Sequence, residues 1–257
     1  MSYDKFLLFG DSITQFSNTL QNGFALQPAL QDLYVRKLDI INRGFSGYSS
    51  EHARVILPKI LESEANIKLM TIFFGTNDSF DHINDIQTVE LPRYKENIDY
   101  LITLAKSKDI KSIVVGPSLH DPRMCLEFFA EGGRQYTKDP NNNQRLYEYS
   151  EAAKEVAKKH NVPFIDLWNI FRETKGWTKE ELFEVSIAKD NWSIGEDGLK
   201  TFLSDGIHFT GESYKILYNE IIKRIDENYP ELKSDNLSIN FSDWKDINPK
   251  DLSSIFK

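Results

Sequence analysis

The sequence contains one cysteine, Cys125, and no apolar run near the roughly 20 residues that a membrane-spanning helix needs. A single cysteine excludes an intrachain disulfide and any metal site built from several cysteines. Cationic side chains are also in the minority, because 31 Lys and Arg face 39 Asp and Glu, giving a net charge of −8. This balance argues against a nucleic-acid partner and against stable association with an anionic membrane.

The first residues also lack the features of a secretory signal. Met1–Lys5 is polar and leads directly into a short apolar stretch. A signal peptide needs a basic segment, a longer apolar segment and a cleavage site after it. We therefore expect a cytoplasmic protein.

The composition is that of a globular protein, with 40 % hydrophobic and 27 % charged residues in a chain of 257. Strand-like apolar runs alternate with helical patterns, which predicts βαβ units and a parallel sheet. The expected strands are Phe6–Phe9, Leu38–Asn42, Ile67–Phe74, Ile110–Val115 and Val162–Leu167. The expected long helices include Pro92–Ser107, Gln144–Lys159 and Gly211–Asn228.

The first strand is followed at once by Gly10–Asp11–Ser12. An uninterrupted apolar run predicts a strand buried on both faces, and ligands of parallel sheets bind at the carboxyl ends of the strands. Ser12 is therefore a candidate nucleophile, presented by a sharp turn that Gly10 permits. Taken alone, however, such a motif more often indicates that Asp11 or Ser12 caps the next helix.

Three further turns carry polar residues at comparable places. Gly44 follows the second strand, Gly75–Asp78 follows the third, and Asp205–His208 precedes the last helix. Because the carboxyl ends of parallel strands meet at one edge of a sheet, we expect the first three turns to lie close together. Acyl transfer needs a nucleophile, a base, a group that orients the base, and donors for the oxyanion.

The four turns supply each of these groups once. His208 is the candidate general base, since an imidazole pKa of about 6.5 suits proton transfer at neutral pH. Asp205 lies three residues earlier and can orient the imidazole. The backbone N–H groups of Ser12 and Gly44 and the amide of Asn77 are the candidate oxyanion hole. We expect neither a cofactor nor a metal ion to take part.

In this order, the turns resemble the four sequence blocks of the SGNH hydrolases, also called GDSL-type esterases. The resemblance extends from the first strand to the last turn, and the first two blocks are most similar to those of fungal acetate-ester hydrolases. It implies a three-layer α/β/α, flavodoxin-like fold with a five-stranded parallel sheet. Ile13 stands where the family has Leu, one apolar residue for another. The resemblance implies the same site residues: Ser12, Gly44, Asn77, Asp205 and His208.

We therefore expect a serine esterase that hydrolyses small, fairly apolar carboxylic esters of the acetate type through an acyl-enzyme on Ser12. Two alternatives remain open. One is a non-catalytic binding module on the same fold. The other is a metal-dependent phosphoesterase, in which the same polar residues are metal ligands. Those ligands would be Asp11, Asn77, Asp78, Asp205 and His208.

The chain is expected to divide into a hydrolase domain, 1–230, and a C-terminal extension, 231–257. The extension is too aromatic for plain disorder, so we expect it to pack on the domain or on a partner subunit, in the second case as a homodimer. The segment 118–143 is long for a connection and predicts a functional lid or a mobile segment. Candidate aromatic residues of the substrate pocket are Phe16, Phe24, Phe45, Phe74 and Phe128.

Overall fold

A computed structural model describes residues 3–21, 23–81, 86–134, 136, 138, 140–189, 191–195 and 197–256. At its centre is a five-stranded parallel sheet with strand order β2-β1-β3-β4-β5. The strands are β1 (Asp4–Gly10), β2 (Leu38–Gly44), β3 (Ile67–Phe73), β4 (Lys111–Val115) and β5 (Phe164–Ile165). This order is the flavodoxin-like one, which confirms the predicted fold class.

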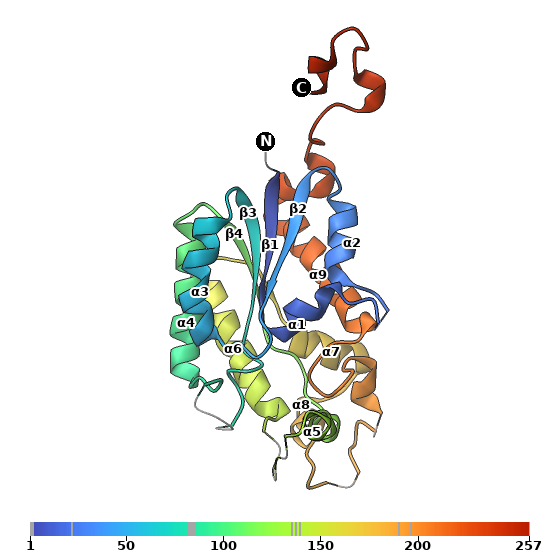
Figure 1. Cartoon of the computed structure of the whole chain (residues 1–257). Helices are drawn as coiled ribbons and strands as arrows, with labels where there is room; N and C mark the ends of the chain where they lie inside the picture. The colour runs from blue at the N-terminus through green and yellow to red at the C-terminus, as the bar shows by residue number, and fades with distance from the viewer. Residues whose placement is uncertain are drawn as a thin grey trace.

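Helices cover both faces of the sheet. Figure 1 shows α3, α4 and α6 on one face and α2 and α9 on the other, so the domain has three layers. The α-helices are α1 (Ser12–Gln15), α2 (Leu26–Leu33), α3 (Ser50–Ser63), α4 (Leu91–Lys106), α5 (Pro122–Glu131), α6 (Asn143–Lys159), α7 (Leu167–Lys175), α8 (Lys179–Phe183) and α9 (Gly211–Asn228). Short 3₁₀ turns are η1 (Phe16–Asn18), η2 (Gly198–Thr201), η3 (Pro230–Leu232), η4 (Ser234–Asn236), η5 (Trp244–Asp246) and η6 (Leu252–Ile255).

The sheet is buried on both faces, as the apolar run in β1 predicts. Phe6 and Leu8 belong to the core beneath α2, α7 and α9, whereas Leu7 and Phe9 belong to the core beneath α3, α4 and α6. This division follows from the alternation of side chains along a strand. Each such side chain contributes about 1.5–3 kcal/mol when it is removed from water, so the strand that leads to Ser12 is firmly anchored.

The fifth strand is shorter than expected, since it spans only Phe164–Ile165 instead of Val162–Leu167. The reason is the residue that follows it. Asp166 caps α7 by accepting a hydrogen bond from the backbone N–H of Asn169 at 3.2 Å, so the chain enters a helix directly after Ile165.

The C-terminal extension has an inner part, which carries η3 and η4, and an outer part, which carries η5 and η6. The inner part packs on the domain, where Ser234 Oγ donates to the carbonyl of Leu33 at 2.7 Å and Tyr34 donates to the carbonyl of Leu232. The outer part projects from the end of the domain opposite α5 (Figure 1), and its Trp244 and Phe256 are 75 % and 67 % exposed. Packing of the outer part on a partner subunit stays a prediction. In the described part of the chain, no helix has both the length and the apolar content to cross a bilayer.

Candidate active site

Ser12 is the first residue of α1, directly after the carboxyl end of β1. Asp11 caps this helix, because its Oδ1 accepts the backbone N–H of Ile13 at 2.9 Å. Gly10 is required here, since a Cβ at this position would lie 2.1 Å from Thr14 Oγ1 and 2.7 Å from the carbonyl oxygen of Phe73. Asp11 is therefore the cap of α1, and Ser12, the next residue, lines a cavity.

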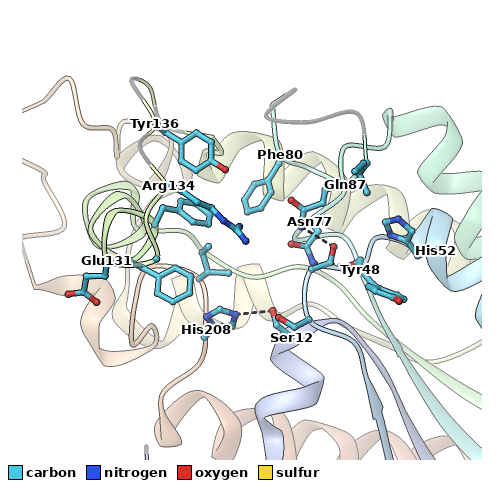
Figure 2. A pocket seen from close by; sticks show the side chains of 17 residues that line it. Ser12, Tyr48, His52, Asn77, Phe80, Gln87, Glu131, Arg134, Tyr136 and His208 are labelled. Carbon is cyan, nitrogen blue, oxygen red and sulfur yellow. Dashed lines mark hydrogen bonds between the residues drawn. The ribbon is translucent and has the colours of Figure 1, made fainter.

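The turn before α9 brings His208 to Ser12. His208 Nε2 lies 2.8 Å from Ser12 Oγ (Figure 2), and His208 Nδ1 lies 2.6 Å from Asp205 Oδ2. Asp205 Oδ1 also accepts the backbone N–H groups of Ile207 at 3.0 Å and His208 at 2.8 Å. Ser12, His208 and Asp205 therefore form one continuous series of contacts. This series links the end of the first strand to the turn before the last helix.

The charge of Asp205 is set by two opposing effects on its pKa. Burial alone would raise the pKa of this carboxyl, but the hydrogen bond and charge of His208 and the two backbone N–H groups outweigh burial. The pKa of Asp205 therefore lies below its ordinary value. At neutral pH the group is an anion, which orients the imidazole and stabilises an imidazolium.

Aromatic rings hold the imidazole from two directions. Phe16 and Phe128 pack edge-on against His208, with ring centroids 5.0 and 5.5 Å away. His208 is 9 % exposed, so these rings restrict both its rotation and its access to water.

The other aromatic candidates divide between the site and the core. Phe45 stacks on Tyr48, which lines the cavity. Phe24 packs against Tyr218, and Phe74 packs against Phe9 in the core, so neither contributes to the cavity wall.

Two of the three expected oxyanion donors lie at the cavity, but Gly44 does not. The N–H of Gly44 donates to Asn42 Oδ1 at 2.9 Å. A Cβ at Gly44 would lie 2.0 Å from the backbone nitrogen of Gln15, so this glycine permits close packing of β2 on α1. The assignment of Gly44 to the oxyanion hole is therefore corrected.

Gly47, three residues after Gly44, lies at the cavity instead. It lines the cavity with a left-handed backbone (φ +79°), and its carbonyl accepts Gln87 Nε2 at 2.9 Å. Within the described residues, no acceptor contacts its N–H. Asn77 also lines the cavity, where Nδ2 donates to the carbonyl of Tyr48 at 2.9 Å and keeps a second N–H.

Two buried carboxyl groups lie behind the cavity. Asp78 accepts the backbone N–H of Ser50 at 2.9 Å and the hydroxyl of the same residue, which ties the loop after β3 to the start of α3. Burial raises the pKa of Asp78 and of Asp11 to about 7 each. Neither lines the cavity, so their role is to hold the turns that carry Asn77 and Ser12.

The cavity has a volume of about 810 Å³ and opens over the Ser12–His208 pair (Figure 2). Its lining residues are Ser12, Ser46, Gly47, Tyr48, His52, Asn77, Phe80, Ile86, Gln87, Phe128, Phe129, Glu131, Gly132, Arg134, Tyr136, Ile207 and His208. Across the described ranges, no three or more His, Cys, Asp or Glu side chains are grouped so as to hold a metal ion.

Sequence reasoning missed several lining residues, among them Tyr48, His52, Phe80, Arg134 and Tyr136. The length of the segment 118–143 is part of the signal, because it predicts a functional segment. Within it, α5 and the residues after it form one wall of the cavity. Movement of this wall, as in a lid, stays a prediction.

Comparison with known proteins gives a consistent result. Residues 8–216 match the model of the GDSL-like Lipase/Acylhydrolase family. An isoamyl acetate-hydrolyzing esterase of Saccharomyces cerevisiae is 37 % identical over 96 % of this chain and 96 % of its own. An isoamyl acetate-hydrolyzing esterase 1 homolog of Rattus norvegicus is 31 % identical over 95 % of this chain and 88 % of its own.

Solved structures share the fold at lower identity. A lipase/acylhydrolase from Enterococcus faecalis is 22 % identical, with a TM-score of 0.55, over 93 % of this chain and 100 % of its own. A catalytic mutant of an acetylxylan esterase from Geobacillus stearothermophilus is 17 % identical, with a TM-score of 0.60, over 87 % of this chain and 94 % of its own. The chain therefore belongs to the GDSL-like lipase/acylhydrolase family and is, like its relatives, an ester-hydrolysing enzyme.

Proposed function

We propose that the protein is a serine esterase in which Ser12 is the nucleophile. The observation that carries this proposal is the 2.8 Å contact between His208 Nε2 and Ser12 Oγ, continued by the 2.6 Å contact between His208 Nδ1 and Asp205. His208 takes the hydroxyl proton as Ser12 attacks the ester carbonyl, and then donates it to the departing alkoxide. Water, activated by the same imidazole, hydrolyses the acyl-enzyme and releases the acid.

The oxyanion of the tetrahedral intermediates is stabilised by three donors in this proposal. They are the backbone N–H groups of Ser12 and Gly47 and the free N–H of the Asn77 amide. A donor of this kind lowers the barrier by roughly 3 kcal/mol when it points at the developing charge. The left-handed backbone of Gly47 and the Gln87 hydrogen bond to its carbonyl support this role.

We further propose small, fairly apolar carboxylic esters of the acetate type as substrates. The aromatic rings of Phe80, Phe128 and Tyr136 line the cavity, and apolar walls with a few polar groups are typical of small-molecule sites. Relatives named isoamyl acetate-hydrolyzing esterases match nearly the whole chain, which supports the same class.

The test is a series of 4-nitrophenyl esters from acetate to octanoate, assayed with the wild-type protein and with Ser12→Ala. The proposal expects turnover that is highest for short acyl chains, is lost in the variant, and is abolished by a serine-directed organophosphate. Loss of activity on EDTA treatment, restored by a metal ion, would support the phosphoesterase instead. The absence of turnover on every ester would support a binding module.

The outer part of the C-terminal extension leads to a separate proposal on assembly. It exposes Trp244, Leu252 and Phe256 at the end of the domain opposite α5 (Figure 1). We propose that a second copy of the chain covers these side chains in a homodimer. Light scattering should give twice the mass of one chain, and Trp244→Ser with Phe256→Ser should reduce it to one; a monomeric wild-type protein contradicts the proposal.

A further inference from the structure

The wall formed by α5 ends in a turn that directs an arginine into the cavity. The N–H of Gly133 donates to the carbonyl of Ala130 at 3.0 Å, and the N–H of Arg134 donates to that of Phe129 at 2.8 Å. This pair of bonds, with Gly133 at φ +76°, is a Schellman motif, which reverses the chain at a helix end. Figure 2 shows the Arg134 side chain running back into the cavity.

No carboxylate among the described residues forms an ion pair with Arg134. Glu131 also borders the cavity, but Figure 2 shows its carboxylate turned away from Arg134. Lys138, four residues farther on, instead pairs with Asp81 at 2.9 Å. In a chain with a net charge of −8, a guanidinium that lines the cavity and pairs with no described carboxylate is suited to bind an anion.

The position of this cation identifies the part of the substrate that it faces. Phe128 of α5 contacts the His208 ring, and Figure 2 shows Arg134 on the His208 side of the cavity. Tyr48 and His52 lie on the other side of Ser12 in the same view. Because His208 protonates the departing oxygen, the alcohol part of the ester must occupy the His208 side. The acyl part then lies toward Tyr48.

We propose that the cavity recognises esters whose alcohol part carries a carboxylate, and that Arg134 binds this carboxylate. The substrates of this class are O-acyl hydroxycarboxylic acids. Hydrolysis breaks the acyl–oxygen bond, adds one water and releases the short-chain acid and a hydroxycarboxylate. The inference rests on the proposed serine-esterase function; it keeps the short acyl part proposed above and places a charged group on the alcohol part.

The experiment compares pairs of acetate esters that differ only in charge: 3- and 4-acetoxybenzoate against 3- and 4-acetoxybenzamide. The measured quantity is the ratio of kcat/KM for the anionic ester to kcat/KM for its neutral partner. We expect Arg134→Gln to lower this ratio about five- to tenfold, as for a partly exposed hydrogen bond between charged groups. Arg134→Lys should retain part of the preference, because it keeps the charge but not the planar fork.

Lys138→Gln is the matched control, because it removes one positive charge from the same segment outside the cavity. Its ratio should equal that of the wild type. An unchanged ratio in Arg134→Gln, or an equal fall in Lys138→Gln, overturns the inference.

A second pair of substrates tests which side of the ester carries the anion. Mono-4-nitrophenyl succinate and 4-nitrophenyl butyrate share the alcohol, and only the first has a carboxylate on its acyl part. Arg134→Gln should leave their kcat/KM ratio as in the wild type, and a fall there instead of in the acetoxybenzoate ratio overturns the assignment. Failure of the function itself is separate: wild-type protein would hydrolyse none of these esters, or Ser12→Ala would hydrolyse them normally.

Discussion

The floor and the α5 wall of the cavity are built in different ways. The floor carries Ser12, Asn77 and His208 on turns at the edge of the sheet, and all three are nearly buried. The wall carries Phe128, which is 38 % exposed, and Arg134, which is also exposed and lines the cavity. The residues proposed for the chemistry are thus held by the core of the fold, whereas the wall presents side chains that can change without disturbing that core.

The largest expected effect comes from the floor. Ser12→Ala should reduce kcat/KM for acetate esters by about 10⁴-fold or more, since the nucleophile is lost. The melting temperature should change little, because α1 keeps its Asp11 cap. Ester kinetics together with thermal unfolding check both statements, and wild-type turnover in this variant would remove Ser12 from the mechanism.

The next effect tests the oxyanion hole. Asn77→Ala should lower kcat by about 10²–10³-fold with a small change in KM, because the lost donor acts in the transition state. Gln87→Ala is the matched control, since Gln87 also donates to a carbonyl of the Gly47–Tyr48 turn. A much smaller loss of kcat is expected there. Equal losses in both variants would show that Asn77 only supports the turn.

A smaller effect is expected from the wall. Phe128→Ala should raise KM for esters with bulky alcohol parts by about three- to tenfold, because a partly exposed ring is removed from the binding surface. The kcat value should fall less, and Phe128→Leu should restore most of the affinity. Initial-rate kinetics on isoamyl and ethyl acetate measure this difference. A fall in kcat alone would place Phe128 with the floor instead.

The last effect concerns Asp78, which lies behind the floor, and the free energy of unfolding of the protein. The pKa of Asp78 is raised to about 7, so the folded protein holds a proton that the unfolded chain releases near its ordinary carboxyl pKa of about 3.9. The free energy of unfolding should therefore fall as the pH rises from about 4 through 7. Asp78→Asn cannot ionise and should reduce this fall by at most about 1.4 kcal/mol for each pH unit between the two pKa values.

Thermal unfolding of the wild type and of Asp78→Asn between pH 5 and 8 provides the measurement. The other titratable groups are the same in both proteins, so their contributions cancel in the difference between the two curves. Curves that stay parallel across this range would contradict a buried, protonated Asp78.

The floor was predictable because each of its groups follows a local pattern. An apolar run that ends in Gly10–Asp11–Ser12 defines both a strand and its carboxyl end, and Asp205 reaches His208 within one turn. The prediction of the oxyanion donor was wrong at a turn that contains two glycines. Gly44 and Gly47 stand three residues apart, and only the hydrogen bond from Gly44 to Asn42 shows which N–H is occupied.

The wall was less predictable because its position depends on tertiary contacts. A Cβ at Gly206 would lie 2.4 Å from the carbonyl oxygen of Asp121, so α5 rests directly on the turn that carries His208. No spacing in the sequence between 118 and 143 indicates that contact, or the direction in which Arg134 points.

Formation of an acyl-enzyme on Ser12 is tested most directly by mass spectrometry of the protein quenched during turnover of 4-nitrophenyl acetate. We expect one added acetyl group on the peptide that contains Ser12, and none on that peptide in Ser12→Ala. Steady turnover with no acetylated peptide, or with the acetyl group on another residue, would contradict this mechanism.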